Sequence, residues 1–264
     1  MAQLRRMGWR KGVRPRSSGI GRSKLGRVWN HARTVGIWDA LRCALISLLF
    51  RARPDDSAFD RHHGTETSTV FGVRFDDPPA PGQVVRSGST HPAVMRNIFD
   101  SLGADLREFT FVDFGSGKGR ALLCAAAFPF KRIVGLEWST DLCAIARRNV
   151  EIFRSQNQSA PEIEVKCLNV LDYEMPPGPI VVYIFNPFGP TLTRQVFEKI
   201  GRHARGQSDS CLIVFNGADD PQFEFVSACF RDVGIRVLHE CRTLDLHSSW
   251  ILGEGSRNSA TIAD

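Results

Sequence analysis

The sequence lacks the features that mark three common classes of protein. Its seven cysteines show no Cys-x-x-Cys spacing, so neither a zinc site nor a disulfide framework is expected, and a reducing, cytoplasmic environment is favoured. The seven histidines show no metal-ligand spacing either, and we predict no bound metal. No apolar run approaches the ~20 residues of a membrane span, because Asp39 and Arg42 interrupt the best candidate, residues 35–50.

Acidic residues are missing from residues 1–38, whose ten Arg and Lys exceed the formal net charge of +6 of the whole chain. Residues 1–27 also have few periodic apolar positions, a composition typical of a disordered tail. A basic tail of this kind suits peripheral contact with anionic lipid or RNA. Since no RNA-module pattern accompanies it, nucleic acid is the less favoured partner.

The rest of the 264-residue chain divides into an N-terminal extension, one large domain and a short tail. The extension covers residues 28–90, where an amphipathic helix is expected over 28–50, followed by a long irregular connection rich in Pro, Gly and Asp. The domain covers residues 91–255 and begins with a helix at Pro92, for which Thr90 or His91 can serve as the cap. Residues 256–264 form the C-terminal tail.

Short apolar runs alternate with helical patterns along the domain. The runs are "FTFVDF", "RIVGLE", "IEVKCL", "IVVYIF", "CLIVF" and "IRVLHE", and they are nearly continuous in apolar residues, as strands buried on both faces of a parallel sheet must be. Helical periodicity separates them at residues 119–128, 140–154, 190–203 and 220–231. The alternation predicts a doubly wound α/β sheet that binds its ligand at the carboxyl ends of the strands.

The first of these runs leads into a turn with three glycines at alternate positions, in "FVDFGSGKGR". A phosphate-binding P-loop is excluded, because Lys118 is followed by Gly119 and not by Ser or Thr. A dinucleotide fingerprint is disfavoured, because Arg120 stands where its third glycine belongs. The carboxylate of Asp113 would repel a phosphate but attract an ammonium group, so the turn suits a ligand with an amino-acid end and a ribose.

Three motifs, "VDFGSGKGR", "IVGLEWS" and "YIFNPFG", resemble those of the class I S-adenosylmethionine-dependent methyltransferases over roughly residues 85–250. Upstream, "AFDRHHGTETS" and "THPAVMRNIF" are similar to the lead-in of a mostly uncharacterised bacterial group with a helical N-terminal extension. The resemblance implies a mostly parallel, seven-stranded Rossmann-like methyltransferase sheet, an enzyme, and S-adenosyl-L-methionine as cofactor.

The resemblance also implies roles for single residues. Asp113 would lie toward the amino group of the cofactor, and Glu137 would accept hydrogen bonds from both ribose hydroxyls. Adenine would be read by Asn169, which replaces the acid common at that position, or by Asp172. The full set implied for the cofactor is Asp113, Gly115, Ser116, Gly117, Gly119, Glu137, Trp138, Asn169 and Asn186.

The sequence Asn186, Pro187 and Phe188 resembles a shortened form of the Asn-Pro-Pro-aromatic motif of amino-group methyltransferases, and these three residues are the catalytic candidates. They imply a nitrogen acceptor on a protein side chain or a small molecule. Two other functions stay open: a nicotinamide-dependent oxidoreductase, and a non-catalytic cofactor-binding adaptor anchored by the basic arm.

Overall fold

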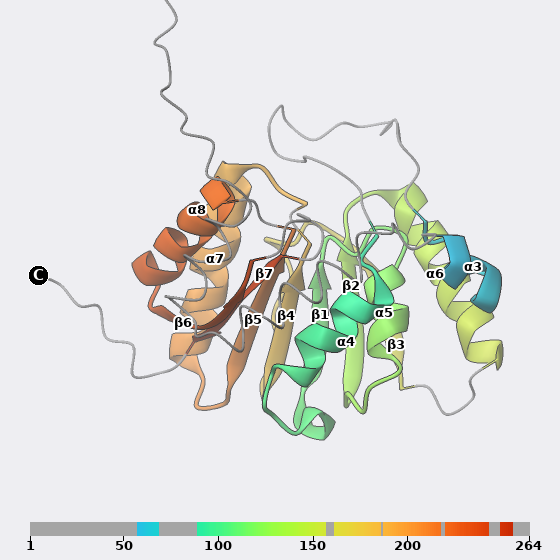
Figure 1. The fold of residues 1–264 in the computed structure, drawn as a ribbon, viewed down its shortest axis with the longest axis horizontal. Coiled ribbons are helices and arrows are strands. Elements are labelled where there is room, and N and C mark those ends of the chain that lie inside the picture. Colours follow the sequence, from blue (N-terminus) through green and yellow to red (C-terminus); the bar gives the residue numbers. More distant parts are fainter. Residues whose placement is uncertain are drawn as a thin grey trace, which may run out of the picture.

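One seven-stranded sheet lies at the centre of the fold (Figure 1). Its strands follow the order β3-β2-β1-β4-β5-β7-β6; the first five pair in parallel, and β7 is antiparallel to both of its neighbours. The prediction of a doubly wound, mostly parallel seven-stranded sheet is thereby confirmed. The strand bounds are β1 Thr110–Phe114, β2 Arg132–Glu137, β3 Ile163–Cys167, β4 Ile180–Ile184, β5 Cys211–Asn216, β6 Ile235–Cys241 and β7 Trp250–Gly255.

The structure is a computed structural model that describes most of the domain and part of the extension. The described residues are 57–68, 89–156, 161–185, 187–217, 220–242 and 249–255. The tail expected at 1–27, the helix expected at 28–50 and the tail at 256–264 lie outside these ranges, as does Asn186.

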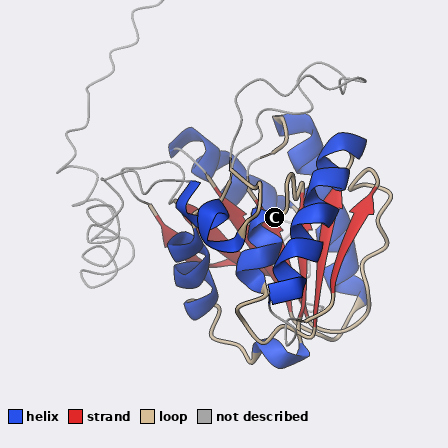
Figure 2. Cartoon of the chain, turned by 90° about the vertical axis from the view of Figure 1, so that its right-hand side faces the viewer, coloured by secondary structure: helices blue, strands red, loops and turns tan. Residues whose placement is uncertain are grey.

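Helices cover both faces of the sheet (Figure 2). One face packs against α4, α5 and α6, and the other against α7 and α8. The sheet separates two apolar clusters because successive strand residues point to opposite faces: Phe111 joins the first cluster, and Val112 and Phe114 join the second. The helix bounds are α4 Pro92–Asp100, α5 Arg120–Ala125, α6 Thr140–Gln156, α7 Pro190–Gly206 and α8 Asp220–Asp232, with a short 3-10 helix at Leu106–Glu108.

The prediction of an irregular connection before residue 90 is wrong at residues 57–63. These residues form α3 (Ser57–His63), and the chain then turns back over its own helix. The carboxyl of Asp60 accepts hydrogen bonds from the backbone N–H groups of Thr67 and Ser68, at 2.9 and 2.7 Å. Such a turn depends on contacts between residues several positions apart, which helical periodicity does not report.

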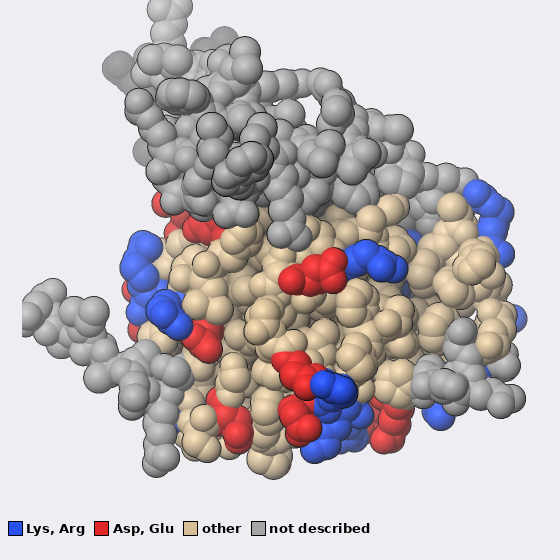
Figure 3. Space-filling model, turned by 60° about the horizontal axis from the view of Figure 1, so that its bottom comes forward, with Lys and Arg blue, Asp and Glu red and all other residues tan. Residues whose placement is uncertain are grey.

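The described surface mixes charges of both signs. On the face shown in Figure 3, basic and acidic side chains lie beside one another. Exposed ion pairs occur among the described residues, such as Arg107 with Asp105 at 2.7 Å and Arg236 with Glu254 at 2.6 Å. No helix within the described ranges is both long and apolar enough to span a bilayer.

The antiparallel pairing of β7 depends on a strand position without a side chain, Gly253. A Cβ atom there would lie 2.6 Å from Ile235 Cγ2 and 2.6 Å from Phe230 Cε2. We expect Gly253→Ala to lower the free energy of unfolding by about 1–3 kcal/mol, measured by urea denaturation, because the core is already filled. Gly206→Ala is the matched control, since a Cβ at that helical position meets nothing within 4 Å. Equal stabilities of the two variants would contradict this packing.

Candidate functional site

The glycine turn follows β1 at the point where the strand order reverses, between β1 and β4. The backbone N–H groups of Gly115 and Ser116 both donate to Leu136 O, at 2.9 Å, which ties the turn to β2. All three glycines have positive φ, with values of 87° at Gly115, 52° at Gly117 and 89° at Gly119. Residues with a Cβ rarely adopt this conformation, so the turn needs glycine for its shape alone.

Two of these glycines, Gly115 and Gly119, lie against other parts of the chain. A Cβ on Gly115 would lie 2.8 Å from Pro187 Cγ, so the bare position admits the proline ring that follows β4. A Cβ on Gly119 would make an ordinary contact with Ala146 Cβ at 3.5 Å, so this position needs glycine for its φ and not for space. The turn therefore packs closely against the residues that follow β4, and it makes ordinary contact with α6.

Glu137, at the carboxyl end of β2, accepts three backbone hydrogen bonds. Its Oε2 accepts from Gly117 N at 2.9 Å, and its Oε1 accepts from Trp138 N at 3.1 Å and from Ser139 N at 3.0 Å. Burial raises the pKa of this carboxyl above its ordinary value, and the three hydrogen bonds oppose that rise. Two carboxylate oxygens offer about four acceptor positions, so Oε2 keeps capacity for a further donor.

The carboxyl of Asp113, unlike that of Glu137, is not surrounded by hydrogen-bond donors. Its side chain is buried at the end of β1, at 3% exposure, and no donor to its carboxyl is found among the described residues. Burial raises the pKa of Asp113 well above its ordinary value, and the charge of Glu137 raises it further. A buried carboxyl without donors favours a cationic partner.

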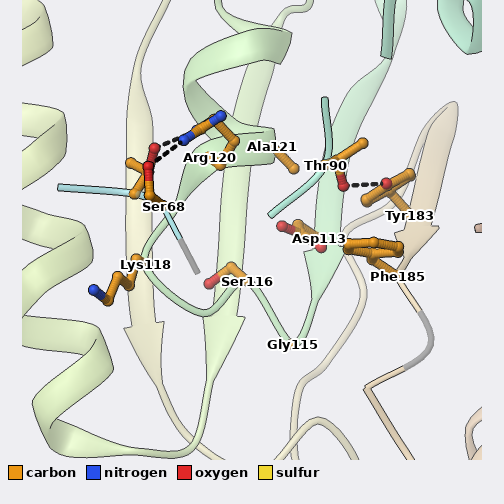
Figure 4. Close-up of a pocket in the computed structure, with 11 residues that line it drawn as sticks. Ser68, Thr90, Asp113, Gly115, Ser116, Lys118, Arg120, Ala121, Tyr183 and Phe185 are labelled. Atoms are coloured by element: carbon orange, nitrogen blue, oxygen red, sulfur yellow. Dashed lines mark hydrogen bonds between the residues drawn. The ribbon is translucent and has the colours of Figure 1, made fainter. Parts of the chain in front are cut away.

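Asp113 faces a pocket above the turn, shown in Figure 4. Ser68, from the segment after α3, lies on one side, and Tyr183 and Phe185 lie on another. Thr67, from the same segment as Ser68, also lines the pocket. Ser116 lies between the two sides, and its Oγ is buried without a hydrogen-bond partner. Unsatisfied buried hydroxyls are rare in folded proteins, so this atom is available to a water molecule or to a ligand.

A chain of buried polar groups closes the β4 side of the pocket. Thr90 Oγ1 lies 2.6 Å from Tyr183 Oη, which accepts a hydrogen bond from Asn216 Nδ2 at 2.8 Å. Burial strongly raises the pKa of Tyr183, so the hydroxyl stays protonated. Of the two predicted caps of α4, His91 takes the role, with Nδ1 accepting from Ala93 N at 3.2 Å, and Thr90 turns to the pocket.

The remaining predicted residues lie at other strand ends. Trp138 is half-buried, and Asn169 is exposed with its Oδ1 accepting from Leu171 N at 2.9 Å. Pro187 and Phe188 both lie near the glycine turn, since a Cβ on Gly115 would lie 2.8 Å from Pro187 Cγ and 3.8 Å from Phe188 Cε1. Phe188 is also buried in the apolar cluster that includes residues of α7 and α8. The roles predicted for these residues, and for Asn186, stay predictions.

The sequence did not single out several residues that line the pocket: Tyr183 and Phe185 in and after β4, Lys118, Arg120 and Ala121 in and after the glycine turn, and Thr67 and Ser68. Tyr183 had a signal, since it is the one polar side chain in an otherwise apolar strand. Thr67, Ser68 and the hydrogen-bond partner Asn216 come to the site only through the folding of distant segments.

No protein-family model and no curated protein matches this chain. Several solved structures resemble it. A ribosomal protein L11 methylase from Lactobacillus delbrueckii subsp. bulgaricus is 16% identical, with a TM-score of 0.45 over 61% of this chain and 74% of that one. A geranyl diphosphate methyltransferase in complex with GPP and sinefungin is 14% identical, with a TM-score of 0.42 over 62% and 78%. The YcgJ protein from Bacillus subtilis is 12% identical, with a TM-score of 0.42 over 58% and 71%. At these identities the likeness concerns the fold alone.

The buried carboxyl of Asp113 makes a prediction about stability and pH. Because its folded-state pKa is raised, its contribution to stability is complete below the unfolded-state pKa, near 3.8, and is lost as the pH rises toward the folded-state pKa. The side-chain amide of asparagine does not ionise, so an Asp113→Asn protein does not lose this stability as the pH rises. We therefore expect ligand-free Asp113→Asn to melt above the unsubstituted protein near neutral pH, by about 2–4 °C for each kcal/mol gained, with a margin that narrows toward pH 4.

The exposed Asp172 provides the control, since Asp172→Asn is expected to change stability by no more than about 0.5 kcal/mol. Thermal melting of the three proteins across the pH range measures the margin. An Asp113→Asn protein that is less stable than the unsubstituted one at neutral pH would show that the carboxylate is stabilised by its surroundings.

Proposed function

We propose that this chain binds S-adenosylmethionine and transfers its methyl group to a nitrogen atom of a protein side chain or a small molecule. The observation that carries the proposal is the pair of buried carboxyls, Asp113 and Glu137, which end two adjacent strands on either side of the glycine turn. Their exposures are 3% and 6%, so each needs a partner that compensates for burial.

This pair of acids favours a methyltransferase that binds S-adenosylmethionine over a nicotinamide-dependent oxidoreductase. A dinucleotide would bring its pyrophosphate over the turn, beside Asp113, where two negative groups in a buried site repel each other strongly. An ammonium group at the same place would be attracted. A ribose diol suits Glu137, whose Oε2 keeps capacity for another donor.

The described residues fit the adenosyl cofactor on three counts. Asp113 would hold its ammonium group, Glu137 its ribose hydroxyls, and the orphaned Oγ of Ser116 would gain a partner in the polar groups of its amino-acid end. Trp138 and Asn169 are the candidates for the adenine side, since each follows the carboxyl end of a strand next to the site.

When bound, the cofactor would supply a methyl group on a sulfonium. The lone pair of the acceptor would bond to the methyl carbon in line with the carbon–sulfur bond, which would break and leave S-adenosylhomocysteine. The work left to the protein is to hold the acceptor about 3 Å from the methyl carbon with its lone pair aimed correctly. The hydrogen-bonded groups of Thr90, Tyr183 and Asn216 give the pocket a wall with a set shape, because each hydroxyl is tied to its neighbour. Phe185 adds an apolar surface beside them.

Binding experiments test the cofactor directly. In calorimetric titrations we expect S-adenosylhomocysteine to bind and NAD not to bind. Glu137→Ala is expected to weaken S-adenosylhomocysteine by about 10- to 100-fold, the loss for a hydrogen bond to a charged group. Glu164→Ala serves as the control, because Glu164 lies on β3 and pairs with Arg132 of β2 and Lys166 of β3, away from the turn. Tighter binding of NAD than of S-adenosylhomocysteine would favour the oxidoreductase.

The nitrogen acceptor is supported by the Asn-Pro-Phe sequence and by the contact of Pro187 with Gly115, which brings this motif beside the turn. If the amide of Asn186 orients the acceptor, Asn186→Ala is expected to leave affinity for S-adenosylhomocysteine nearly intact. It would slow single-turnover methyl transfer by about 10²-fold, or about 3 kcal/mol. Full turnover by a well-folded Asn186→Ala protein would remove this residue from the catalytic set.

A further inference from the structure

Two thiols, those of Cys143 on α6 and Cys167 on β3, lie together at the carboxyl end of β2. Cys143 Sγ donates to Glu137 O at 3.3 Å, and Cys167 Sγ donates to Trp138 O at 3.8 Å. The two acceptors belong to consecutive residues, and the first of these residues carries the carboxylate that holds Gly117 of the glycine turn. The thiol pair is therefore a direct neighbour of the candidate site.

The fold places both cysteines on the same face of the sheet. Ile163 and Val165 of β3 belong to the first apolar cluster, so Cys167, two residues further along the strand, points to that face as well. Cys143 reaches the same cluster from α6. One turn later, Arg147 donates to Val165 O from Nε at 3.3 Å and from Nη2 at 3.1 Å. The helix and the strand are therefore held against each other next to the two thiols.

The two thiols differ in their access to solvent. Both are free, but Cys143 is buried whereas Cys167 is exposed. Burial, together with a hydrogen bond to the thiol of Cys167, raises the pKa of Cys143 to about 12, so this thiol stays protonated. An oxidant that arrives from solvent therefore meets Cys167 first, and it finds a second thiol within hydrogen-bonding reach of the first.

We propose that Cys143 and Cys167 are a redox-active pair, which hydrogen peroxide converts into a disulfide that weakens cofactor binding beside Glu137. The pairing itself follows from the positions of the two thiols. Its effect on the ligand rests on the proposed function, to which the disulfide adds a means of regulation. Reversible disulfides of this kind, in contrast to structural ones, join thiols that are also stable in the reduced protein.

The oxidation takes place in two steps. In the first, the sulfur of Cys167 bonds to one oxygen of the peroxide while the O–O bond breaks, which gives a sulfenic acid and one water molecule. In the second, the sulfur of Cys143 bonds to the sulfur of Cys167 while the S–O bond breaks. The thiol proton of Cys143 leaves with the hydroxyl group as a second water molecule. A dithiol reverses the reaction by thiol–disulfide exchange.

The disulfide would disturb the end of β2. Both thiol protons are removed, so the hydrogen bonds to the carbonyl oxygens of Glu137 and Trp138 are lost. The two sulfurs must also approach to about 2.0 Å, which draws the end of β3 toward α6. Glu137 O accepts a hydrogen bond from Leu168 N, the residue after Cys167, at 2.9 Å. A shift of Cys167 therefore reaches the backbone of the acid that would hold the ribose hydroxyls.

The experiment compares the full chain before and after treatment with hydrogen peroxide. Mass mapping of alkylated peptides is expected to show one cross-linked pair, Cys143 with Cys167, with a mass lower by two hydrogen atoms. S-adenosylhomocysteine is expected to bind the oxidised protein about 10-fold more weakly, the loss for one weakened hydrogen bond to a charged group. Dithiothreitol is expected to restore the affinity.

Single substitutions assign the effect to the pair. In Cys167→Ser, at the exposed position, and in Cys143→Ala, peroxide is expected to change the affinity for S-adenosylhomocysteine by less than about twofold. Cys229→Ala is the matched control, because Cys229 is buried in the second apolar cluster on the other face of the sheet. This control is expected to form the disulfide and to lose affinity as the unsubstituted protein does.

Absence of the Cys143–Cys167 peptide would overturn the inference, and so would an unchanged affinity in the disulfide form. A loss of affinity that persists in Cys167→Ser would assign the effect to another residue and overturn it as well. Each of these results leaves the cofactor proposal standing as long as the reduced protein binds S-adenosylhomocysteine. If the reduced protein does not bind it, the proposed function and the regulatory effect are both wrong, whatever the peptide map shows.

Discussion

The hydrogen bond from Gly117 N to Glu137 Oε2 connects the two strand ends on which the site is built. It holds the turn after β1 against the end of β2, and Gly117 in this turn has a φ of 52°, a conformation that favours glycine. The acid at the end of β1 is thereby buried next to the acid at the end of β2. The pocket, its charges and the proposed cofactor contacts all follow from this arrangement.

Two nearby buried acids reduce the stability of the ligand-free protein. Desolvation raises the pKa values of both Asp113 and Glu137, but the three backbone donors offset this effect only for Glu137. Under the proposed function, the ligand would supply the missing partner of Asp113, and the lower stability of the ligand-free protein would be a consequence of that function. The buried hydroxyl of Ser116 likewise has no hydrogen-bond partner in the ligand-free protein.

The sequence predicted the β1 turn and the Glu137 position because both depend on local signals. A continuous apolar run, three glycines and an acid about 20 residues downstream are visible without any tertiary structure.

The sequence did not predict the contacts between residues that lie far apart in the chain. Examples are the contact of Pro187 with Gly115 and the hydrogen bond between Thr90 and Tyr183, which periodicity does not reveal. Strand β7 was missed as an apolar run, because its glycines and Glu254 interrupt the pattern. Helix α3 was not predicted within the irregular connection, since the turn that holds it depends on hydrogen bonds from Asp60 to residues several positions away.

The protonation of Asp113 tests the central claim most directly. Carboxyl carbon NMR of the protein with labelled aspartate, assigned by comparison with Asp113→Asn, follows this group across the pH range with and without S-adenosylhomocysteine. If the site is built for an ammonium group, the pKa of Asp113 falls when the ligand binds, because the cation favours the ionised form. An unchanged or higher pKa in the complex would contradict the account, since it would mean that the buried acid does not meet a positive charge.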